Sequence, residues 1–159
     1  MADLHPNVER VLAAARERGL DLTIQQFPDG TRTAADAAAA VGCSLGQIVK
    51  SLVFEVDGDV VLAYVSGSNQ LDEHKLATAA GGERAGRVDA DRVRAATGFP
   101  IGGVAPFGHA TELRIFIDRD LLGHDEVWAA AGTPRDNFPI APSELVRASG
   151  GLVADLRKD

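Results

Sequence analysis

Two runs of β-branched and aromatic residues separated by an Asp-Gly pair constrain the fold of this chain more than any other feature. Residues 51–56 read SLVFEV and residues 60–66 read VVLAYVS, with Asp57 and Gly58 between them. Asp-Gly is a typical two-residue hairpin turn, because both positions accept the positive φ angles that match the twist of the flanking strands. The pattern therefore predicts a tight antiparallel hairpin, and it excludes a fold built only of βαβ units.

Helical and strand periodicities alternate along the rest of the chain. Apolar residues recur at three- and four-residue spacing from Val8 onward, whereas LRIFID at 113–118 alternates as a strand does. Thr33 with Asp36, and Ser44 with Gln47, have the spacing of helix caps. We expect helices at 6–18, 33–41, 72–80, 89–97 and 142–149, a helical turn at 44–47, a turn at 27–30, and further strands at 22–26, 113–118, 125–131, 138–140 and 152–156.

This order of elements predicts one α+β domain over residues 1–159, with a mixed, largely antiparallel, barrel-like sheet surrounded by helices. No linker, low-complexity tract or internal repeat interrupts the 159 residues. A chain of this length buries roughly two thirds of the surface that its unfolded form exposes, which is enough for a real core. Aromatic residues make up only 5% of the chain, so Val, Leu, Ile and Ala must build that core.

The single cysteine and the net charge of -7 narrow the functional classes. Cys43 alone forms neither an internal disulfide nor a cysteine-based metal cluster, which points to a reducing compartment. No signal sequence and no apolar run of about 18 residues is present, so we expect a cytoplasmic protein without a membrane partner. The negative charge argues against broad binding to a nucleic-acid backbone, and no DNA partner is expected.

The segment TGFPIGGVAPFGH, residues 97–109, is the part of the chain that ordinary folding requirements explain least. Its glycines and prolines lie among apolar residues with neither helical nor strand periodicity. Gly102 and Gly103 permit close backbone approach or positive φ, while Pro100 and Pro106 stiffen both flanks. A rigid loop of this kind can present N–H groups to a carbonyl, a ribose or a phosphate. A bulged strand followed by a turn is the alternative interpretation.

Lys50 is the strongest single candidate for a catalytic or ligand-binding residue. It follows Ile48 and Val49 and precedes the buried strand, so its ammonium should lie at the end of the sheet with little freedom. A lysine in that position can hold a phosphate or polarise a carbonyl, and burial would lower its pKa. The alternative is an ordinary lysine at a strand end, with its stem on apolar surface and its head in water.

No other motif supplies an obvious reactive group. The four histidines lack the spacing of a helical metal site, and no nucleophile elbow, Walker A motif or G-x-G-x-x-G motif is present. Cys43 reads as a structural thiol. His109 ends the glycine loop and remains either a site residue or a surface turn residue. The chain thus combines a lysine and a glycine loop with no metal, cofactor or protein nucleophile expected.

Four segments together resemble the YbaK/EbsC-type aminoacyl-tRNA deacylases, which are related to the editing insertion domain of bacterial prolyl-tRNA synthetase. The segments are QIVKSLVFEVDGDVVLAYV, QLDEHKLA, TGFPIGGVAPFGH with its Gly102-x-x-x-Pro106 spacing, and AAAG followed by PSELVRASGGLVADL. The resemblance implies an enzyme acting in trans that hydrolyses the ester of a wrong small amino acid, of the Cys or Ala type, on tRNA. Transfer RNA for proline is the expected substrate, and prolyl-tRNA synthetase is a possible partner.

The resemblance also implies roles for individual residues. Lys50 would anchor the terminal nucleotide or the ester carbonyl, and Gly102 and Gly103 would orient the aminoacyl group while a ribose hydroxyl helps to activate water. Ser51 and Thr33 occupy positions where relatives carry small hydroxyl residues. The remaining candidate substrate contacts are Pro106, His109 and Asn137.

Departures from the family pattern affect the expected substrate. Ala130 stands where some relatives have a serine, and residues 133–137 replace a glycine-rich turn with a nearby acid. Two other classes stay open: a module that binds tRNA or a synthetase without catalysis, and a domain that binds a small molecule or nucleotide. The basic residues from Lys75 to Arg94 alternate with acids, as in a solvated face, or grip the acceptor end weakly and in a salt-dependent way.

Overall fold

The hairpin expected from the sequence forms the centre of the fold. The computed structural model describes residues 4–27 and 33–159. In it β2 (Val49–Val56) and β3 (Asp59–Ser66) pair antiparallel along the whole length of both strands. Asp57 and Gly58 close the turn with φ angles of 51° and 92°, as the Asp-Gly signal predicted.

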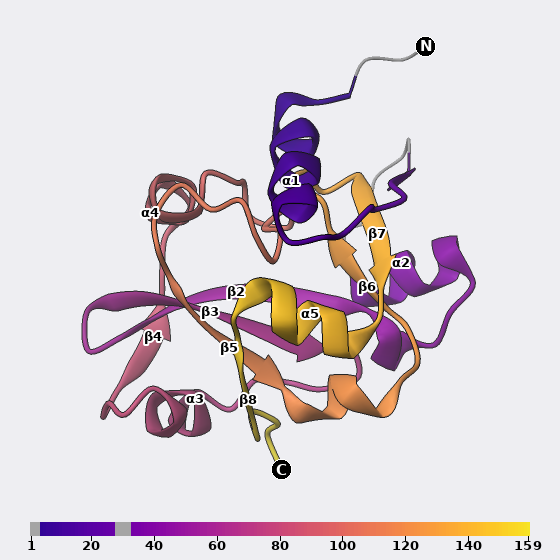
Figure 1. Cartoon of the computed structure of the whole chain (residues 1–159). Coiled ribbons are helices and arrows are strands. Elements are labelled where there is room, and N and C mark those ends of the chain that lie inside the picture. The colour runs from indigo at the N-terminus through magenta and orange to yellow at the C-terminus, as the bar shows by residue number, and fades with distance from the viewer. Residues whose placement is uncertain (1–3, 28–32) are drawn as a thin grey trace.

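Two sheets are built around this hairpin (Figure 1). The larger has the order β4-β2-β3-β5-β8, and the smaller has the order β1-β7-β6. The further strands are β1 (Gln25–Gln26), β4 (Ala85–Arg87), β5 (Arg114–Asp118), β6 (Val127–Ala130), β7 (Asp136–Ile140) and β8 (Leu152–Ala154).

Strand pairing confirms a mixed, largely antiparallel arrangement. The pairs β1–β7, β2–β3, β2–β4 and β6–β7 are antiparallel, and β3–β5 and β5–β8 are parallel. A parallel bridge between Ile48 and Trp128 links the two sheets. In the described part of the chain the sheets do not close into a barrel. The expected mixed pairing is therefore present, but the expected barrel-like closure is not.

The helices begin and end close to the positions that their caps indicated. They are α1 (Pro6–Glu17), α2 (Ala34–Val41), α3 (Glu73–Ala79), α4 (Ala90–Thr97) and α5 (Pro142–Ser149), with single turns η1 (Leu45–Gln47) and η2 (Arg119–Gly123). The Thr33 hydroxyl accepts from the Asp36 N–H at 3.1 Å, and Ser44 and Gln47 form the expected capping box. Gly42 ends α2 with a φ of 75°.

Some elements differ from the expectations. The strand expected at 22–26 is reduced to β1, and β7 begins at Asp136, two residues earlier than expected, because pairing with β6 and β1 extends it. Strand β4 and turn η2 were not predicted: the three residues of β4 include a glycine and have no alternation, and they become a strand by pairing with the edge of β2. Of the turn expected at 27–30, residues 28–30 lie outside the described residues.

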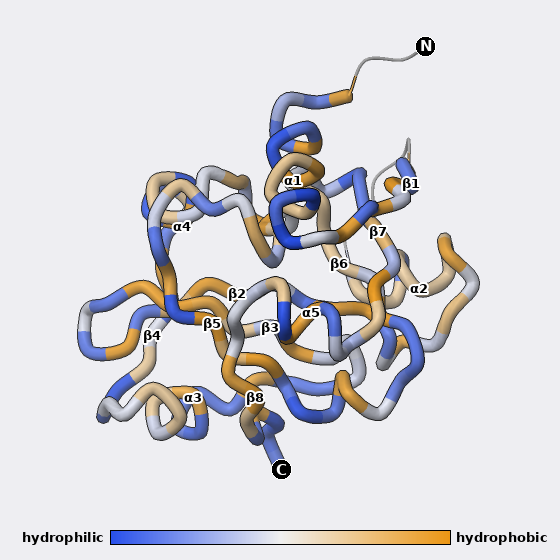
Figure 2. Tube along the Cα trace, viewed as in Figure 1, coloured by the Kyte–Doolittle hydropathy of each residue, from blue (hydrophilic) through white to orange (hydrophobic). Residues whose placement is uncertain are grey.

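The helices cover the large sheet on both faces. One face packs against α1, α5, the segment after α4 and the small sheet, in a cluster that includes Leu62, Tyr64 and Leu145. The other face packs against α3 through Leu76 and Ala77. Figure 2 shows hydrophobic residues concentrated along the central strands. No helix among the described residues is long and apolar enough to cross a membrane.

Candidate active site

The two faces of β2 have different surroundings. Val49 and Val53 belong to the cluster under α1 and α5, whereas Leu52 and Phe54 pack against the cluster under α3. Side chains alternate along a strand, so Lys50 lies on the face of Leu52 and Ser51 lies on the opposite face. The register agrees: Lys50 is paired with Val65 of the α3 cluster, and Ser51 with Tyr64 of the other.

Lys50 interrupts an otherwise apolar face between two helices. On one side of it Ile48 packs with Ala37 and Ala38 of α2, and on the other side Leu52 packs with the residues under α3. A charged side chain between two apolar clusters is held by its stem while its head reaches the gap between them. The expectation that Lys50 has little freedom at the entrance of a strand is consistent with this position.

The edge of β2 next to Lys50 has no strand partner in the described chain. Ile48, the residue before β2, bridges to Trp128 of β6, and β4 covers only Phe54 to Val56. Between these two contacts no further strand pairing covers this edge of β2 among the described residues. Main-chain polar groups at such an edge are available to a ligand.

Strand β6 runs beside this edge in the same direction as β2. Lys50 lies two residues after Ile48, and Ala130 lies two residues after Trp128. Because side chains alternate along a strand, Lys50 and Ala130 lie on the same face as the bridged residues. Ala130 is paired with Asn137 of β7, which extends the row to the second sheet. The topology therefore brings Lys50, Ala130 and Asn137, which are far apart in the sequence, to one face of the molecule.

The Lys50 ammonium donates to the main-chain carbonyl of Asn69. Burial lowers the pKa of Lys50 below its ordinary value, and the negative charge of Asp118 partly opposes this change. Lys50 lines an open cleft of about 590 Å³. The ionisable side chains that share this cleft are Asp72, Glu73, His74, Arg87 and Lys158.

The segment from Gly98 to Leu113 is an irregular loop, as the glycine and proline content indicated, and no bulged strand forms in it. Gly102 has a φ of 86° and is exposed near Pro134, whereas Gly103 is buried against Thr133. A Cβ added at Gly103 would lie 2.8 Å from the Thr133 Cα, so only glycine permits this approach. The loop thus rests on the turn that leads into β7.

The N–H group of Gly103 donates to the Pro100 carbonyl at 3.0 Å. This bond closes a turn inside the loop, so the Gly103 N–H is not available to an oxyanion in this conformation. Ile101, which is 61% exposed, lines a groove of about 260 Å³ together with Val53 of β2. Ile101 therefore carries the loop to the open edge of β2, although no direct contact joins Lys50 to Gly102 or Gly103 in the described chain.

His109 closes the loop from within. Its Nε2 lies 2.7 Å from the Ala105 carbonyl oxygen, which also accepts from the Tyr64 hydroxyl at 2.8 Å. A carbonyl only accepts hydrogen bonds, so Nε2 carries a proton. Burial lowers the pKa of His109, with the Ala105 carbonyl opposing this effect and Arg18 and Arg10 adding to it. Pro106 is buried beside these residues.

We expect the protein to lose stability on acidification because the imidazole of His109 is neutral in the folded state. Its pKa is lower in the folded than in the unfolded chain, so its stabilising effect is complete above the unfolded value of about 6.5 and declines as the pH falls below it. Thermal unfolding of the parent and of His109→Gln between pH 8 and pH 5 measures this. The stability advantage of the parent should shrink toward pH 5, and a constant difference would show that His109 is not the titrating group.

Ser51 and Asn137 each contain a buried polar atom without a hydrogen-bond partner in the described chain, Oγ in Ser51 and Nδ2 in Asn137. Buried polar groups are usually paired, so an unpaired one calls for an explanation such as a ligand or an ordered water. Ser51 lies on β2, and Asn137 lies on β7, the strand paired with β6. Both residues were among the candidates chosen from the sequence.

The candidate Thr33, and Cys43, which the sequence indicated to be a structural thiol, both have structural partners. The Thr33 hydroxyl caps α2, a role that the sequence also predicted, and the residue is exposed. Burial raises the pKa of Cys43, which keeps its thiol protonated, and its Sγ lies 3.4 Å from the Ser44 carbonyl. No group of three or more His, Cys, Asp or Glu residues suited to a metal ion occurs within residues 4–27 and 33–159.

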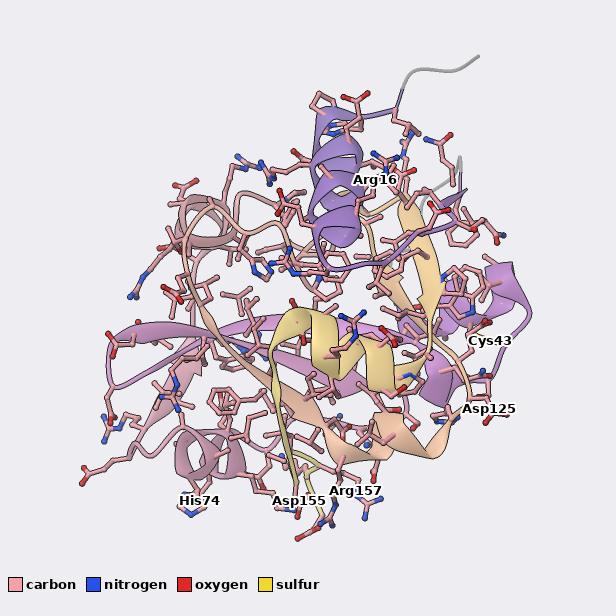
Figure 3. All side chains as sticks on the ribbon, viewed as in Figure 1. Arg16, Cys43, His74, Asp125, Asp155 and Arg157 are labelled. Carbon is pink, nitrogen blue, oxygen red and sulfur yellow. The ribbon has the colours of Figure 1, made fainter. Side chains whose placement is uncertain are left out.

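The basic residues between Lys75 and Arg94 divide into two kinds. Lys75 pairs with Asp155 and Asp159, and Arg92 pairs with Glu55, so these two are neutralised by neighbouring acids. Arg87 makes no ion pair among the described residues and lines the Lys50 cleft. Figure 3 shows His74, another residue lining this cleft, on the outer side of α3.

Sequence reasoning missed the polar residues behind Lys50. Asp118 is fully buried at the end of β5, and Asn69 is 9% exposed in the turn after β3. The signal available in the sequence was weak: an aspartate ends the apolar strand RIFID, and a short polar run, SGSNQ, follows VVLAYV. Neither position indicates by itself that the two side chains meet.

Comparison with known proteins gives consistent results. The model of the aminoacyl-tRNA editing domain family matches residues 28–148. The uncharacterized protein YwhH of Bacillus subtilis (strain 168) is 31% identical over 86% of this chain and 87% of its own length. The proline--tRNA ligase of Nitratidesulfovibrio vulgaris (strain DP4) is 33% identical over 95% of this chain, which spans only 27% of the ligase.

A solved structure has nearly the same fold. It is described as a candidate trans-editing enzyme for prolyl-tRNA synthetase, and it superimposes with a TM-score of 0.92 at 47% identity. The match covers 99% of this chain and 100% of the other. Fold, sequence and family model agree with the resemblance drawn from the four segments: this chain belongs to the aminoacyl-tRNA editing domain family.

Proposed function

We propose that this protein is a trans-editing deacylase of the cytoplasm that hydrolyses the ester bond of a mischarged aminoacyl-tRNA. Membership of the editing family supports the reaction class. The observation that carries the proposal is the position of Lys50, a charged group held at an open strand edge on the same face as Ala130 and Asn137. The reaction needs no metal, cofactor or protein nucleophile.

In this proposal Lys50 binds the substrate by charge. Its ammonium has one acceptor in the described chain, the Asn69 carbonyl, so its other N–H groups are free to contact the terminal nucleotide or the ester carbonyl oxygen. Water attacks the carbonyl carbon, the bond to the ribose oxygen breaks, and that oxygen takes up a proton. The products are the free amino acid and tRNA. A fixed positive charge stabilises the oxyanion that develops during this attack.

The glycine loop shapes the other side of the site. Gly103 contributes by its close packing on Thr133, since its N–H is used within the loop, while Gly102 is exposed and can present its backbone to the aminoacyl group. Pro106 and His109 keep the loop rigid. The unpaired Ser51 Oγ and Asn137 Nδ2 are the polar atoms that we assign to substrate or to ordered water.

The substrate we propose is a small amino acid, of the Cys or Ala type, on tRNA for proline. The relation to proline--tRNA ligases supports this choice of tRNA. Editing of such a product is needed because one binding pocket discriminates poorly between small apolar side chains. Ala130 lies on the Lys50 face without a polar group of its own, which favours a small apolar side chain over a hydroxylated one.

A panel of mischarged tRNAs tests the proposal directly. We expect the purified protein to release alanine or cysteine from tRNA for proline faster than a blank without protein, and to leave prolyl-tRNA intact. Proline is larger than alanine or cysteine, so we expect a site suited to the smaller amino acids to exclude it. Deacylation is followed by loss of labelled amino acid from the tRNA at several pH values.

Two experimental outcomes would contradict this function and indicate another one. Binding of uncharged tRNA or of prolyl-tRNA synthetase without any ester loss would identify a non-catalytic module. Stabilisation of the fold by a metabolite, with none by a non-hydrolysable aminoacyl-adenosine, would identify a domain outside translation. Because the net charge is -7, tRNA affinity should be weak and should fall steeply with salt.

A further inference from the structure

Behind Lys50 lies a buried polar network that connects two segments of the chain, residues 66–69 and residues 118–120. The Asn69 amide donates to Asp118 Oδ2 and to Asp120 Oδ2, both at 2.8 Å. Asp118 Oδ2 also accepts from the Ser66 N–H at 3.1 Å, and its Oδ1 accepts from the Asp120 N–H at 3.0 Å. The network links the turn after β3 to the end of β5 and the start of η2.

Asp118 is an unusual residue to find in this position. Its side chain is fully buried, and no cation lies within ion-pair distance of it among the described residues. A buried carboxylate is costly unless several hydrogen bonds satisfy it. The three donors named above supply these hydrogen bonds and offset the cost of burial. The same bonds fix the positions of Ser66, Asn69 and the start of η2.

Hydrogen bonds from both its N–H group and its side chain therefore fix the main chain of Asn69. Its N–H donates to the Ser66 carbonyl at 2.9 Å, and its side chain is gripped by two carboxylates. Its carbonyl is the acceptor of the Lys50 ammonium. A flexible lysine loses much rotamer freedom when it is ordered, and a fixed acceptor reduces the positions that its head can occupy.

We propose that Asn69, held in place by Asp118, is a positioning residue for Lys50: it fixes one hydrogen bond of the ammonium and thereby directs the remaining N–H groups toward the substrate. This inference rests on the proposed function for its catalytic consequence. The arrangement itself does not depend on that function.

The same network acts on the charge state of Lys50. Burial favours the neutral amine, and the negative charge of Asp118 favours the ammonium. Of the other ionisable groups around Lys50, Asp72, Glu73, His74, Arg87 and Lys158 line the cleft. Asp120 lies beyond Asn69 and pairs with Arg157 at 3.3 Å. Figure 3 shows Arg157 beside Asp155, near the C-terminal end of the chain.

Two variants test the proposal. Asp118→Asn removes the buried charge, and Asn69→Ala removes the amide while leaving the bonds from Asp118 to Ser66 and Asp120. The first readout is independent of tRNA: the pH dependence of Lys50 labelling by an amine-reactive reagent, followed by mass spectrometry. We expect the midpoint for Lys50 to move to lower pH in Asp118→Asn, and labelling of Lys50 to become faster at a given pH in Asn69→Ala.

The second readout is deacylation by the same proteins. Misplacement of a reacting group by about 1 Å costs up to a hundredfold in rate, so we expect Asn69→Ala to lower kcat by about tenfold to a hundredfold with a smaller change in KM. In Asp118→Asn the fall in activity on the alkaline side should begin at lower pH. Asp155→Asn, which weakens a partly buried ion pair with Lys75, is the matched control and should change neither readout.

The two readouts separate the possible failures. If Lys50 labelling changes and no chain deacylates any tRNA, the positioning role stands and the proposed function fails. If both variants fold and label Lys50 as the parent does, the positioning role is wrong whatever the activity. Should Asp118→Asn fail to fold, Asn69→Ala alone decides, and Asp120→Asn, at a partly exposed carboxylate, provides a milder version of the same loss.

Discussion

Lys50→Ala should abolish measurable deacylation while leaving the fold intact. We expect the rate constant to fall by at least about a hundredfold, the size of effect found when one preorganised group that stabilises a developing oxyanion is removed. The side chain lies on a sheet face with its head in an open cleft, and its one hydrogen bond in the described chain is to the Asn69 carbonyl. Its loss should therefore cost little stability. The measurement is release of labelled amino acid from mischarged tRNA under single-turnover conditions.

The control for this variant is Lys75→Ala. Lys75 is a lysine of the same domain whose ammonium pairs with Asp155 and Asp159, and its truncation should leave the deacylation rate near the parental value. Lys50→Arg separates charge from geometry, since a guanidinium keeps the charge but presents a planar, longer head. Parental activity in Lys50→Ala would contradict the assignment of the site. Unfolding of Lys50→Ala, seen by circular dichroism, would show that Lys50 also supports the fold.

Local signals in the sequence identified most of the elements that surround this lysine. The Asp57-Gly58 turn has the positive φ angles that the dipeptide indicates, and Thr33 caps the helix that follows it. These features depend on residues within four positions of one another, so the sequence contains all the information needed. The irregular loop of residues 98–113 was recognised for the same reason, because glycine and proline act locally.

Long-range pairing limited the prediction of the site. Strand β4 exists because β2 offers it an edge, and the row from Lys50 through Ala130 to Asn137 depends on a bridge between residues 80 positions apart. The support of Lys50 by Asn69 and Asp118 depends in the same way on the parallel pairing of β3 with β5. No periodicity in a single strand specifies which other strand lies beside it.

Lys50 and the glycine loop illustrate the difference. Each was singled out from its own residues, but nothing in those residues indicates that they reach β2 from different directions. The structure places Lys50 on the α3 face of β2 and brings the loop to Val53 through Ile101. It also shows that the Gly103 N–H is already bonded to Pro100, a detail that only the folded loop determines.

Gly103→Ala should damage both stability and activity, because the loop has no room for a methyl group. The added Cβ would lie 2.8 Å from the Cα and the carbonyl carbon of Thr133 and 2.9 Å from its nitrogen, which are backbone atoms that no side-chain rotation can move away. Overpacking of this kind costs about 1–3 kcal/mol. For a domain of this size each kcal/mol lowers the melting temperature by roughly 2–4 °C. Thermal unfolding at neutral pH measures the loss.

The activity of Gly103→Ala should fall by more than its stability explains, because the displaced residue organises the start of β7. The Thr133 hydroxyl donates to Asp136 Oδ2 at 2.6 Å and accepts from the Asp136 N–H at 3.1 Å, so a shift of Thr133 moves the segment that carries Asn137. Gly123→Ala is the matched control, since a Cβ there meets nothing within 4 Å. A Gly103→Ala protein that is destabilised as expected, yet deacylates at the parental rate well below its melting temperature, would separate the glycine loop from the active site. Reduced activity with the Gly123→Ala control unchanged would place the contact between Gly103 and Thr133 within it.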